Sequence, residues 1–214
     1  MNCKAFWAGF YKQQNKQEAC NFFVFLFLRI SIFAEKRYPF SMNNSICKTQ
    51  EKDPFTFRLA EKSDLDELER IYETARAYMK NTGNALQWGT TYPEKETTAC
   101  DIAEKALYIM EKNGNPCACF TLLEGEDPTY TEIDGKWLND EPYAAVHRVA
   151  SDGSHHGVVK AMMDFVFSKF CNIKIDTHEN NKTMQKALKN YGFKYTGIII
   201  TTDGTPRLAF QLKK

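Results

Sequence analysis

Residues 142–165 read PYAAVHRVASDGSHHGVVKAMMDF, and this stretch decides the fold. Residues 142–150 are rich in Ala, Val and aromatic side chains and predict a buried strand. Residues 151–157 contain Ser, Asp and two Gly, which favour a turn. From Val158 to Phe170 apolar residues recur at helical spacing. A strand, a turn of small residues and a helix are therefore predicted to follow one another.

The residues before this stretch predict a strand, two helices and a hairpin. Phe55–Leu59 alternates apolar and polar residues, as a strand does. Ser63 is expected to cap a helix whose apolar residues lie on one side, and Gly83 is expected to end it. The other elements predicted here are a weaker helix over 94–105 and two strands over 106–110 and 117–123, joined by a turn at 112–116.

The residues around and after the stretch complete a mixed α/β pattern. Residues 125–141 are polar and rich in turn-forming residues and predict a loop. The remaining predicted elements are a strand over 172–177, a helix over 183–191 ended by Gly192, and a final hairpin that turns at Asp203–Gly204. One folded domain over residues 53–214 accounts for all of these elements.

The first 52 residues differ in composition from the rest. They carry eight Lys/Arg and three Glu, whereas the whole chain has a net charge of +1. Residues 22–34, FFVFLFLRISIFA, are apolar but too few to cross a bilayer as a helix, and Arg29 interrupts them. Three interpretations stay open: an extension upstream of a start at Met42, an uncleaved segment that contacts a membrane, or a cleaved secretory signal. We expect residues 1–52 to be a poorly ordered extension.

Charge and cysteine usage exclude some classes of function. The near balance of charge is not that of a protein with a broad basic surface, so no nucleic-acid partner is predicted. Seven cysteines are scattered without the paired spacing of a structural zinc site, so no metal site is predicted. Cys117 and Cys119 lie two apart in a predicted strand and are expected to pack in the core. A reduced, cytoplasmic setting fits this usage best.

Three stretches carry a resemblance to a known family. They are residues 142–165, the segment IKIDTHENNKTMQKALKNYGFKYTG at 173–197, and QWGTTYP near Trp88. Together with the order of elements, they resemble the GNAT superfamily of N-acetyltransferases over roughly 160 residues. The resemblance implies an acyl-CoA N-acyltransferase fold: a mixed, mostly antiparallel sheet that splays near its middle, with helices on both faces and the coenzyme at the splay.

The resemblance also implies where acetyl-CoA would bind. The backbone of the predicted strand at Val149 and Ala150 would face the pantetheine arm, and the turn before the helix would offer N–H groups to the pyrophosphate. The residues matching that turn are Ser154, His155, His156, Gly157, Val158 and Val159. Of the family's usual Arg/Gln, Gly and Gly/Ala pattern, only Gly157 is present. Asn181 matches the family's coenzyme-binding asparagine, with a helix cap as the alternative.

Catalysis by such an enzyme needs a deprotonated amine and often an acid for the departing thiolate. The family's acidic tyrosine is replaced here by Leu188. Tyr191, near the end of the same helix, is the candidate acid, with packing as the alternative. His147 is the candidate base because an imidazole has an unperturbed pKa of about 6.5. Transfer in which water relays the proton needs neither residue.

The acceptor is the part that the sequence leaves open. Trp88 and Tyr92 are the candidate lining of its pocket, with Tyr130 and Trp137 as further aromatic residues and Glu73 or Glu96 to attract an ammonium group. We expect an N-acetyltransferase that acts on a primary amine of a small molecule or peptide. The alternative is a catalytically inactive, acyl-CoA-binding or regulatory module. A homodimer is the default expectation for assembly.

Overall fold

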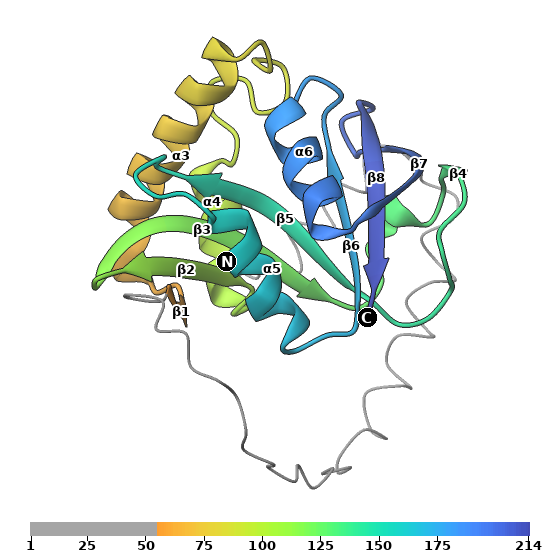
Figure 1. Cartoon of the computed structure of the whole chain (residues 1–214). Coiled ribbons are helices and arrows are strands. Elements are labelled where there is room, and N and C mark those ends of the chain that lie inside the picture. Colours follow the sequence, from red (N-terminus) through yellow and green to blue (C-terminus); the bar gives the residue numbers. More distant parts are fainter. Residues whose placement is uncertain (1–54) are drawn as a thin grey trace, which may run out of the picture. The chain divides into compact units, whose positions relative to one another are not determined.

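An eight-stranded sheet organises residues 55–214, the part of the chain that the computed structural model describes. The order of the strands is β1-β2-β3-β5-β6-β8-β7-β4 (Figure 1). Their bounds are β1 Thr56–Leu59, β2 Leu107–Lys112, β3 Asn115–Glu124, β4 Asp134–Gly135, β5 Ala144–Ser151, β6 Asn172–Thr177, β7 Lys194–Ile200 and β8 Pro206–Lys213. Within these residues, all neighbouring strands are antiparallel except β5 and β6. The predicted mixed, mostly antiparallel sheet is confirmed.

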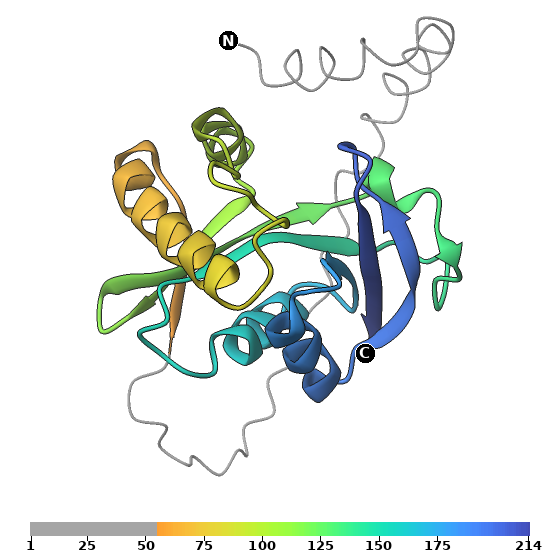
Figure 2. The same cartoon turned by 90° about the horizontal axis from the view of Figure 1, so that it is seen from above.

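Helices cover both faces of the sheet, as Figure 2 shows. On one side, the α3/α4 face, lie α3 (Leu65–Asn81) and α4 (Lys95–Ala103). On the other, the α5/α6 face, lie α5 (Val158–Phe167) and α6 (Lys182–Tyr191). Each helix buries its apolar residues against the sheet: Leu68 and Ile71 of α3 pack with Cys119, whereas Met162 and Met163 of α5 pack with Phe120. Consecutive residues of β3 therefore serve different cores, as strand geometry requires.

β5 and β6 separate part-way along their length. They pair only at Ala144–Ile173, Ala145–Lys174 and Val146–Ile175. β5 then continues to Ser151 against β3, while β6 continues to Thr177 against β8. The sheet therefore splays after Val146, which confirms the splay expected from the sequence.

A bulge in β5 lies at this splay. His147 pairs with Thr121 and Ala150 with Cys119, so β5 uses one more residue than β3 over the same distance. Arg148 has a φ of 50°, in the left-handed region that non-glycine residues rarely adopt. His147 and Arg148 consequently both project from the α3/α4 face, where strict alternation would place them on opposite faces.

The structure corrects two details of the sequence-based prediction. Ser63 was expected to cap the first helix, but it lies in a short 3-10 turn, η1 (Lys62–Asp64), and Asp64 is the N-cap of α3. Asp64 takes this place because its carboxylate accepts hydrogen bonds from the Glu61 N–H and from Arg58.

The second correction concerns residues 125–141, which were predicted to be only a loop. They contain a 3-10 turn, η2 (Pro128–Tyr130), and the short strand β4, which pairs with β7. This pairing depends on two glycines, because a Cβ on Gly135 would lie 2.3 Å from the Thr196 carbonyl oxygen and one on Gly197 would lie 2.3 Å from that of Asp134. Because β4 has only two residues and depends on close contact between main chains, it shows no alternation of apolar and polar side chains that could predict a strand.

The predicted amino-terminal extension, residues 1–52 with the apolar segment 22–34, lies outside the described residues. From residue 55 onward, no helix combines the length and the apolar character needed to cross a bilayer.

Candidate functional site

The open edge of β5 begins the candidate site. From His147 to Ser151 this strand pairs with β3 on one side only, since β6 has turned away. Main-chain N–H and C=O groups at such an edge can pair with an extended ligand. Val149 and Ala150, expected to face the coenzyme arm, lie on this edge; Ala150 packs into the α3/α4 core and Val149 against the α5/α6 core.

The turn of residues 151–157 connects this edge to the amino end of α5. Gly157 is the N-cap of α5 and has a φ of 80°, and nothing lies within 4 Å of the position that a Cβ would take. The first N–H groups of a helix have no partner within the helix and carry partial positive charge, so they favour an anion. Gly157 thus leaves open space in front of a main-chain anion site.

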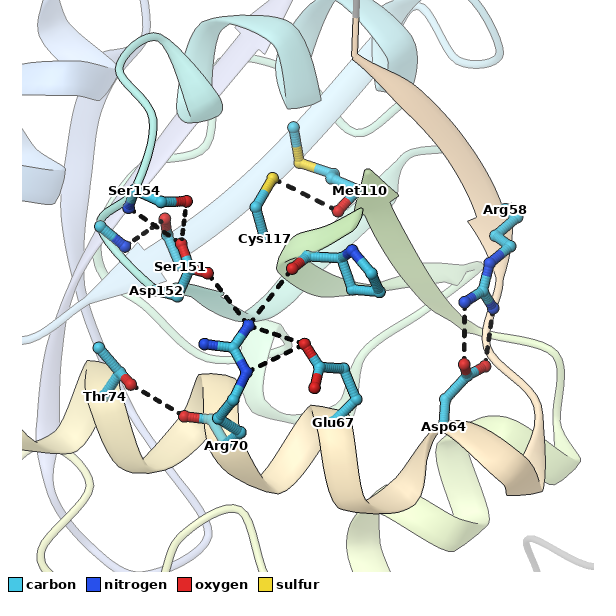
Figure 3. Close-up of polar contacts among 12 residues, drawn as sticks. Arg58, Asp64, Glu67, Arg70, Thr74, Met110, Cys117, Ser151, Asp152 and Ser154 are labelled. Atoms are coloured by element: carbon cyan, nitrogen blue, oxygen red, sulfur yellow. Dashed lines mark hydrogen bonds and ion pairs between the residues drawn. The ribbon is translucent and has the colours of Figure 1, made fainter. Parts of the chain in front are cut away.

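Asp152 organises the start of this turn, as Figure 3 shows. Its Oδ1 accepts hydrogen bonds from the Ser154 N–H (2.9 Å) and from the Ser154 hydroxyl (2.5 Å). Burial raises the pKa of Asp152, but the hydrogen bonds from Ser154 and from Arg70 outweigh it and lower the pKa below its usual value. Both donors of Ser154 therefore serve Asp152, so donors to a phosphate must come from the residues that follow.

Arg70 of α3 contacts the start of the turn through Asp152. One guanidinium nitrogen, Nη2, contacts Asp152 Oδ2 at 3.1 Å, Glu67 Oε1 at 2.7 Å and the Pro116 carbonyl oxygen at 3.3 Å (Figure 3). Arg70 thus joins α3, the start of β3 and the turn after β5, and it neutralises a carboxylate beside the proposed anion site.

The two histidines of the turn lie in different surroundings. His155 is half-buried, with its ring 6.2 Å from the Phe55 ring in an edge-to-face contact, and His156 is exposed. Val158 is buried and Val159 is half-buried against the α5/α6 core. Contact of these four residues with a coenzyme stays a prediction.

Asn181 is the N-cap of α6, the role that sequence analysis held as the alternative. Its side-chain oxygen accepts a hydrogen bond from the Met184 N–H at 3.0 Å. Its Nδ2 donates to Gln87 Oε1 at 3.0 Å, which joins α6 to the segment between α3 and α4. A direct contact with coenzyme stays a prediction.

On the α3/α4 face, His147 stands between two aspartates. Its Nε2 is 2.8 Å from Asp127 Oδ2, and its Nδ1 is 3.7 Å from Asp176 Oδ1. Tyr130 donates its hydroxyl hydrogen to Asp176 at 2.7 Å and places its ring 5.7 Å from the imidazole. Burial raises the pKa of Asp127, but hydrogen bonds and charge from His147, with hydrogen bonds from Thr129, lower it to about 2. Asp127 is therefore ionised at neutral pH and orients the ring through Nε2.

Arg148 lies next to His147 on the same face, and it was not among the residues predicted from the sequence. Its Nε and Nη2 contact the Asp101 carboxylate at 2.6 and 2.9 Å, and Thr121 donates to the same carboxylate at 2.9 Å. Both charged side chains are more than 90% buried. The remaining nitrogen, Nη1, donates to the Tyr92 hydroxyl at 3.3 Å. The bulge in β5 brings this pair to the site, and a bulge leaves no signal in the alternation of side chains.

The two residues proposed as the acceptor lining contact each other but differ in exposure. Trp88 is buried and packs edge to face with Tyr72 and Tyr92, so it belongs to the α3/α4 core. Tyr92 is 38% exposed and its hydroxyl lies at Arg148. Glu73 and Glu96 line a groove of about 590 Å³ between α3 and α4.

Comparison with known proteins identifies the fold that carries this geometry. The sequence matches no protein-family model and no curated protein sequence. Among solved structures, the GNAT-family acetyltransferase from Streptococcus agalactiae 2603 has a TM-score of 0.69 and 29% sequence identity, covering 75% of this chain and 95% of that one. This chain has the GNAT acetyltransferase fold. The resemblance drawn from the sequence is confirmed, and the comparison supports the acyltransferase class that it implied.

More distant structures share the GNAT fold alone. The GNAT-family acetyltransferase from Listeria monocytogenes 4b F2365 has a TM-score of 0.56 and 17% identity, covering 75% of this chain and 95% of its own. The aminoglycoside acetyltransferase AAC(6')-Ib, in complex with coenzyme A and kanamycin, has a TM-score of 0.52 and 19% identity, again covering 75% of this chain and 95% of its own. The GNAT fold therefore accounts for nearly the whole length of each of these proteins.

Tyr191 lies apart from the His147 cluster of this GNAT fold. Its hydroxyl donates to Asp164 of α5 at 2.8 Å and accepts from Lys214 at 2.9 Å, and its ring stacks on Phe167. Burial, followed by the hydrogen bond to Asp164, raises the pKa of Tyr191. These contacts place it against the α5/α6 core, on the opposite face from His147. The structure thus does not bring the two candidate catalytic residues together, and it gives Tyr191 the packing contacts held as the alternative.

Proposed function

We propose that this chain is an N-acetyltransferase that transfers the acetyl group of acetyl-CoA to a primary amine. The single observation that carries the proposal is the open edge of β5, which leads directly into the 151–157 turn and the amino end of α5. An extended thiol arm fits the edge, and a pyrophosphate fits the helix terminus, in the order in which coenzyme A joins them.

Two further features support a coenzyme at this place. The Thr177 hydroxyl, at the end of β6, is buried and has no hydrogen-bond partner among residues 55–214. A buried polar atom without a partner is costly, and a ligand amide can supply one. Gly157 offers open space where any other residue would place a Cβ. The residues that would hold the coenzyme are the main chain at Val149 and Ala150 and the N–H groups at 156–159.

Acetyl-CoA would supply an activated acyl carbonyl, and the chain would prepare the amine. Asp127 and Asp176 give the α3/α4 side of the splay two carboxylates that attract an ammonium group. His147, oriented by Asp127, would take the proton from that ammonium through Nδ1, directly or through one water. The neutral amine then forms the new C–N bond and the C–S bond breaks. The nitrogen loses its second proton to solvent, and the thiolate takes a proton from solvent, because Leu188 stands where the family's acid would be.

A non-catalytic acyl-CoA-binding or regulatory module is the second candidate. Three observations favour it: the donors of Ser154 are used by Asp152, Val159 stands where the family has Gly or Ala, and Leu188 replaces the family's acidic tyrosine. The two candidates predict the same coenzyme binding and differ in turnover. Seven scattered cysteines, with Cys117 and Cys119 buried as thiols, support a cytoplasmic setting for either.

Thiol release distinguishes the two candidates. The full chain is incubated with acetyl-CoA and a panel of primary amines, and free coenzyme A is measured against a reaction without protein. An N-acetyltransferase releases thiol only when a suitable amine is present, and the product carries one acetyl group by mass. Binding of acetyl-CoA by calorimetry, with no amine-dependent release across the panel, would favour the non-catalytic module.

A further inference from the structure

Arg207 of β8 is a buried cation that no acidic side chain of residues 55–214 pairs with. It is only 7% exposed. Its hydrogen bonds go to two main-chain carbonyl oxygens, that of the adjacent Pro206 at 3.3 Å and that of Gln87 at 3.4 Å. Both are longer than the usual 2.7–3.2 Å. Within residues 55–214, no carboxylate oxygen lies within 4.0 Å of its guanidinium.

Such an arrangement is unfavourable unless another group completes it. Removing a charge from water costs several kcal/mol, and paired charges or good hydrogen bonds must offset that cost. Arg148, whose side chain is also buried on this face, shows the usual solution, with Asp101 held through two nitrogens. Arg207 has the same burial and five N–H donors in a planar fork, which matches a carboxylate bidentately.

The position of Arg207 relates it to the proposed reaction site. β6 and β8 pair Asp176 with Ala209, so Arg207, two residues along β8, is the diagonal neighbour of Asp176 on the same face. Diagonal neighbours have Cα atoms about 7–8 Å apart. Asp176 in turn lies beside His147. A cation and a carboxylate thus stand near each other at the splay without forming an ion pair.

The groups around Arg207 leave it available. His178 follows β6 next to Arg207, and burial, then the charge of Arg207, lowers the pKa of His178, so that it adds no second cation at neutral pH. Asp203 lies near enough to interact with the charge of Arg207, but it forms no ion pair with it. Its carboxylate instead accepts hydrogen bonds from Thr201 and Thr205. In the segment between α3 and α4, the Gln87 carbonyl oxygen accepts a hydrogen bond from Arg207.

We propose that Arg207 binds a carboxylate of the acceptor, so that the acceptor is an amino acid or another primary amine that carries a carboxylate. Its ammonium group faces Asp176 and His147, and its carboxylate faces the guanidinium of Arg207. The inference rests on the proposed acetyl transfer and adds the class of acceptor. It also explains why Asp176 and Arg207 do not pair: each receives one end of the same ligand.

The test compares acceptors that differ only in the carboxylate. The full chain is assayed for amine-dependent thiol release with the twenty standard L-amino acids, with their carboxamides, and with the amines that lack the carboxyl group. We expect the best acceptor to bear a free carboxylate and to exceed its carboxamide in kcat/KM by at least about tenfold, since a charge-assisted hydrogen bond is about twice as strong as a neutral one. Carboxamides that serve equally well in the wild-type protein would overturn the proposal.

Variants assign the effect to Arg207. Arg207→Gln should raise KM for the carboxylate acceptor and bring the two acceptors within about threefold, while Arg207→Lys should restore part of the preference. Lys174→Gln is the matched control, because Lys174 is a buried cation of the same face, held between Trp137 and Tyr143; it should keep the preference. A preference that survives Arg207→Gln would overturn the assignment.

Failure of this inference is distinguishable from failure of the proposed function. Calorimetric titration of acetyl-CoA should give the same Kd for wild type and Arg207→Gln. Normal coenzyme binding and transfer only to amines without a carboxylate would reject the acceptor class and keep the acetyltransferase. Absence of coenzyme binding by the wild type would reject both.

Discussion

The buried ion pair between Arg148 and Asp101 gives the sharpest prediction for stability. Replacing Asp101 with Asn leaves the guanidinium of Arg148 buried with neutral partners only, since Thr121 and Tyr92 are its other contacts. Removing one partner of a buried pair costs about 3–5 kcal/mol. For a domain of this size, about 1 kcal/mol lowers Tm by roughly 2–4 °C, so Asp101→Asn should lower Tm by about 6–20 °C. Arg148→Met should cost a similar amount, because it leaves the carboxylate of Asp101 buried.

The double variant supplies the control for this prediction. Asp101→Asn with Arg148→Met removes both charges, and replacement of a buried pair by neutral groups is often close to neutral. The two single losses sum to about 6–10 kcal/mol, and urea unfolding followed by circular dichroism should give a double variant that loses far less than this sum. Additive losses, or a cost of Asp101→Asn below about 1 kcal/mol, would show that the pair is not buried and coupled as described.

Three further predictions follow from the site. Asp127→Asn should lower the free energy of unfolding at pH 7 by about 2 kcal/mol. The carboxyl of Asp127 has a pKa of about 2 in the folded chain, so it stabilises the fold above its ordinary pKa of 3.8 and loses this effect as the pH falls toward 2. Urea titrations from pH 7 to pH 2 should show the difference between wild type and variant shrinking, and a constant difference would contradict the prediction. His147→Gln should lower kcat by about 10²-fold with an unchanged acetyl-CoA Kd, measured by thiol release against pH, and an unchanged pH profile of kcat would remove His147 as the base. Arg70→Met should weaken acetyl-CoA binding by several-fold because it releases Asp152 beside the anion site, whereas Arg58→Met, which breaks the contacts with Asp64 and Glu111, should not; equal effects in calorimetry would assign Arg70 to stability alone.

Much of the fold could be predicted because its signals are local. The strand over 172–177 has the same bounds in sequence and structure, and the helix predicted over 183–191 begins one residue earlier. Gly157 marked the turn before α5 since a small residue was needed at a left-handed position. Even the cap role of Asn181 could be stated as an alternative, because capping uses a side chain and an N–H three residues apart.

The arrangement of the site could not be predicted, because its residues meet through long-range pairing. Asp127 and Asp176 reach His147 from segments about 20 and 29 residues away along the chain. Arg148 reaches Asp101 only through a bulge, which breaks the alternation on which strand prediction depends. Arg207 is a single arginine at the start of a strand, and its hydrogen bond to the Gln87 carbonyl oxygen joins residues 120 apart in the chain. No periodic pattern in the sequence predicts any of these contacts.

Binding of acetyl-CoA at the amino end of α5 is the central claim, and calorimetric titration of the coenzyme into the full chain tests it most directly. Two variants accompany the wild type. Gly157→Ala and Gly114→Ala replace glycines whose φ is 80° and 77°, and each added Cβ would have open space around it. Both variants therefore carry the same backbone strain, of about 1 kcal/mol. Of the two, Gly157 alone lies at the proposed anion site. We predict that the wild type binds, that Gly114→Ala binds equally well, and that Gly157→Ala binds at least about tenfold more weakly. A wild type that does not bind at millimolar coenzyme, or a Gly157→Ala variant that binds as the wild type does, would contradict the account.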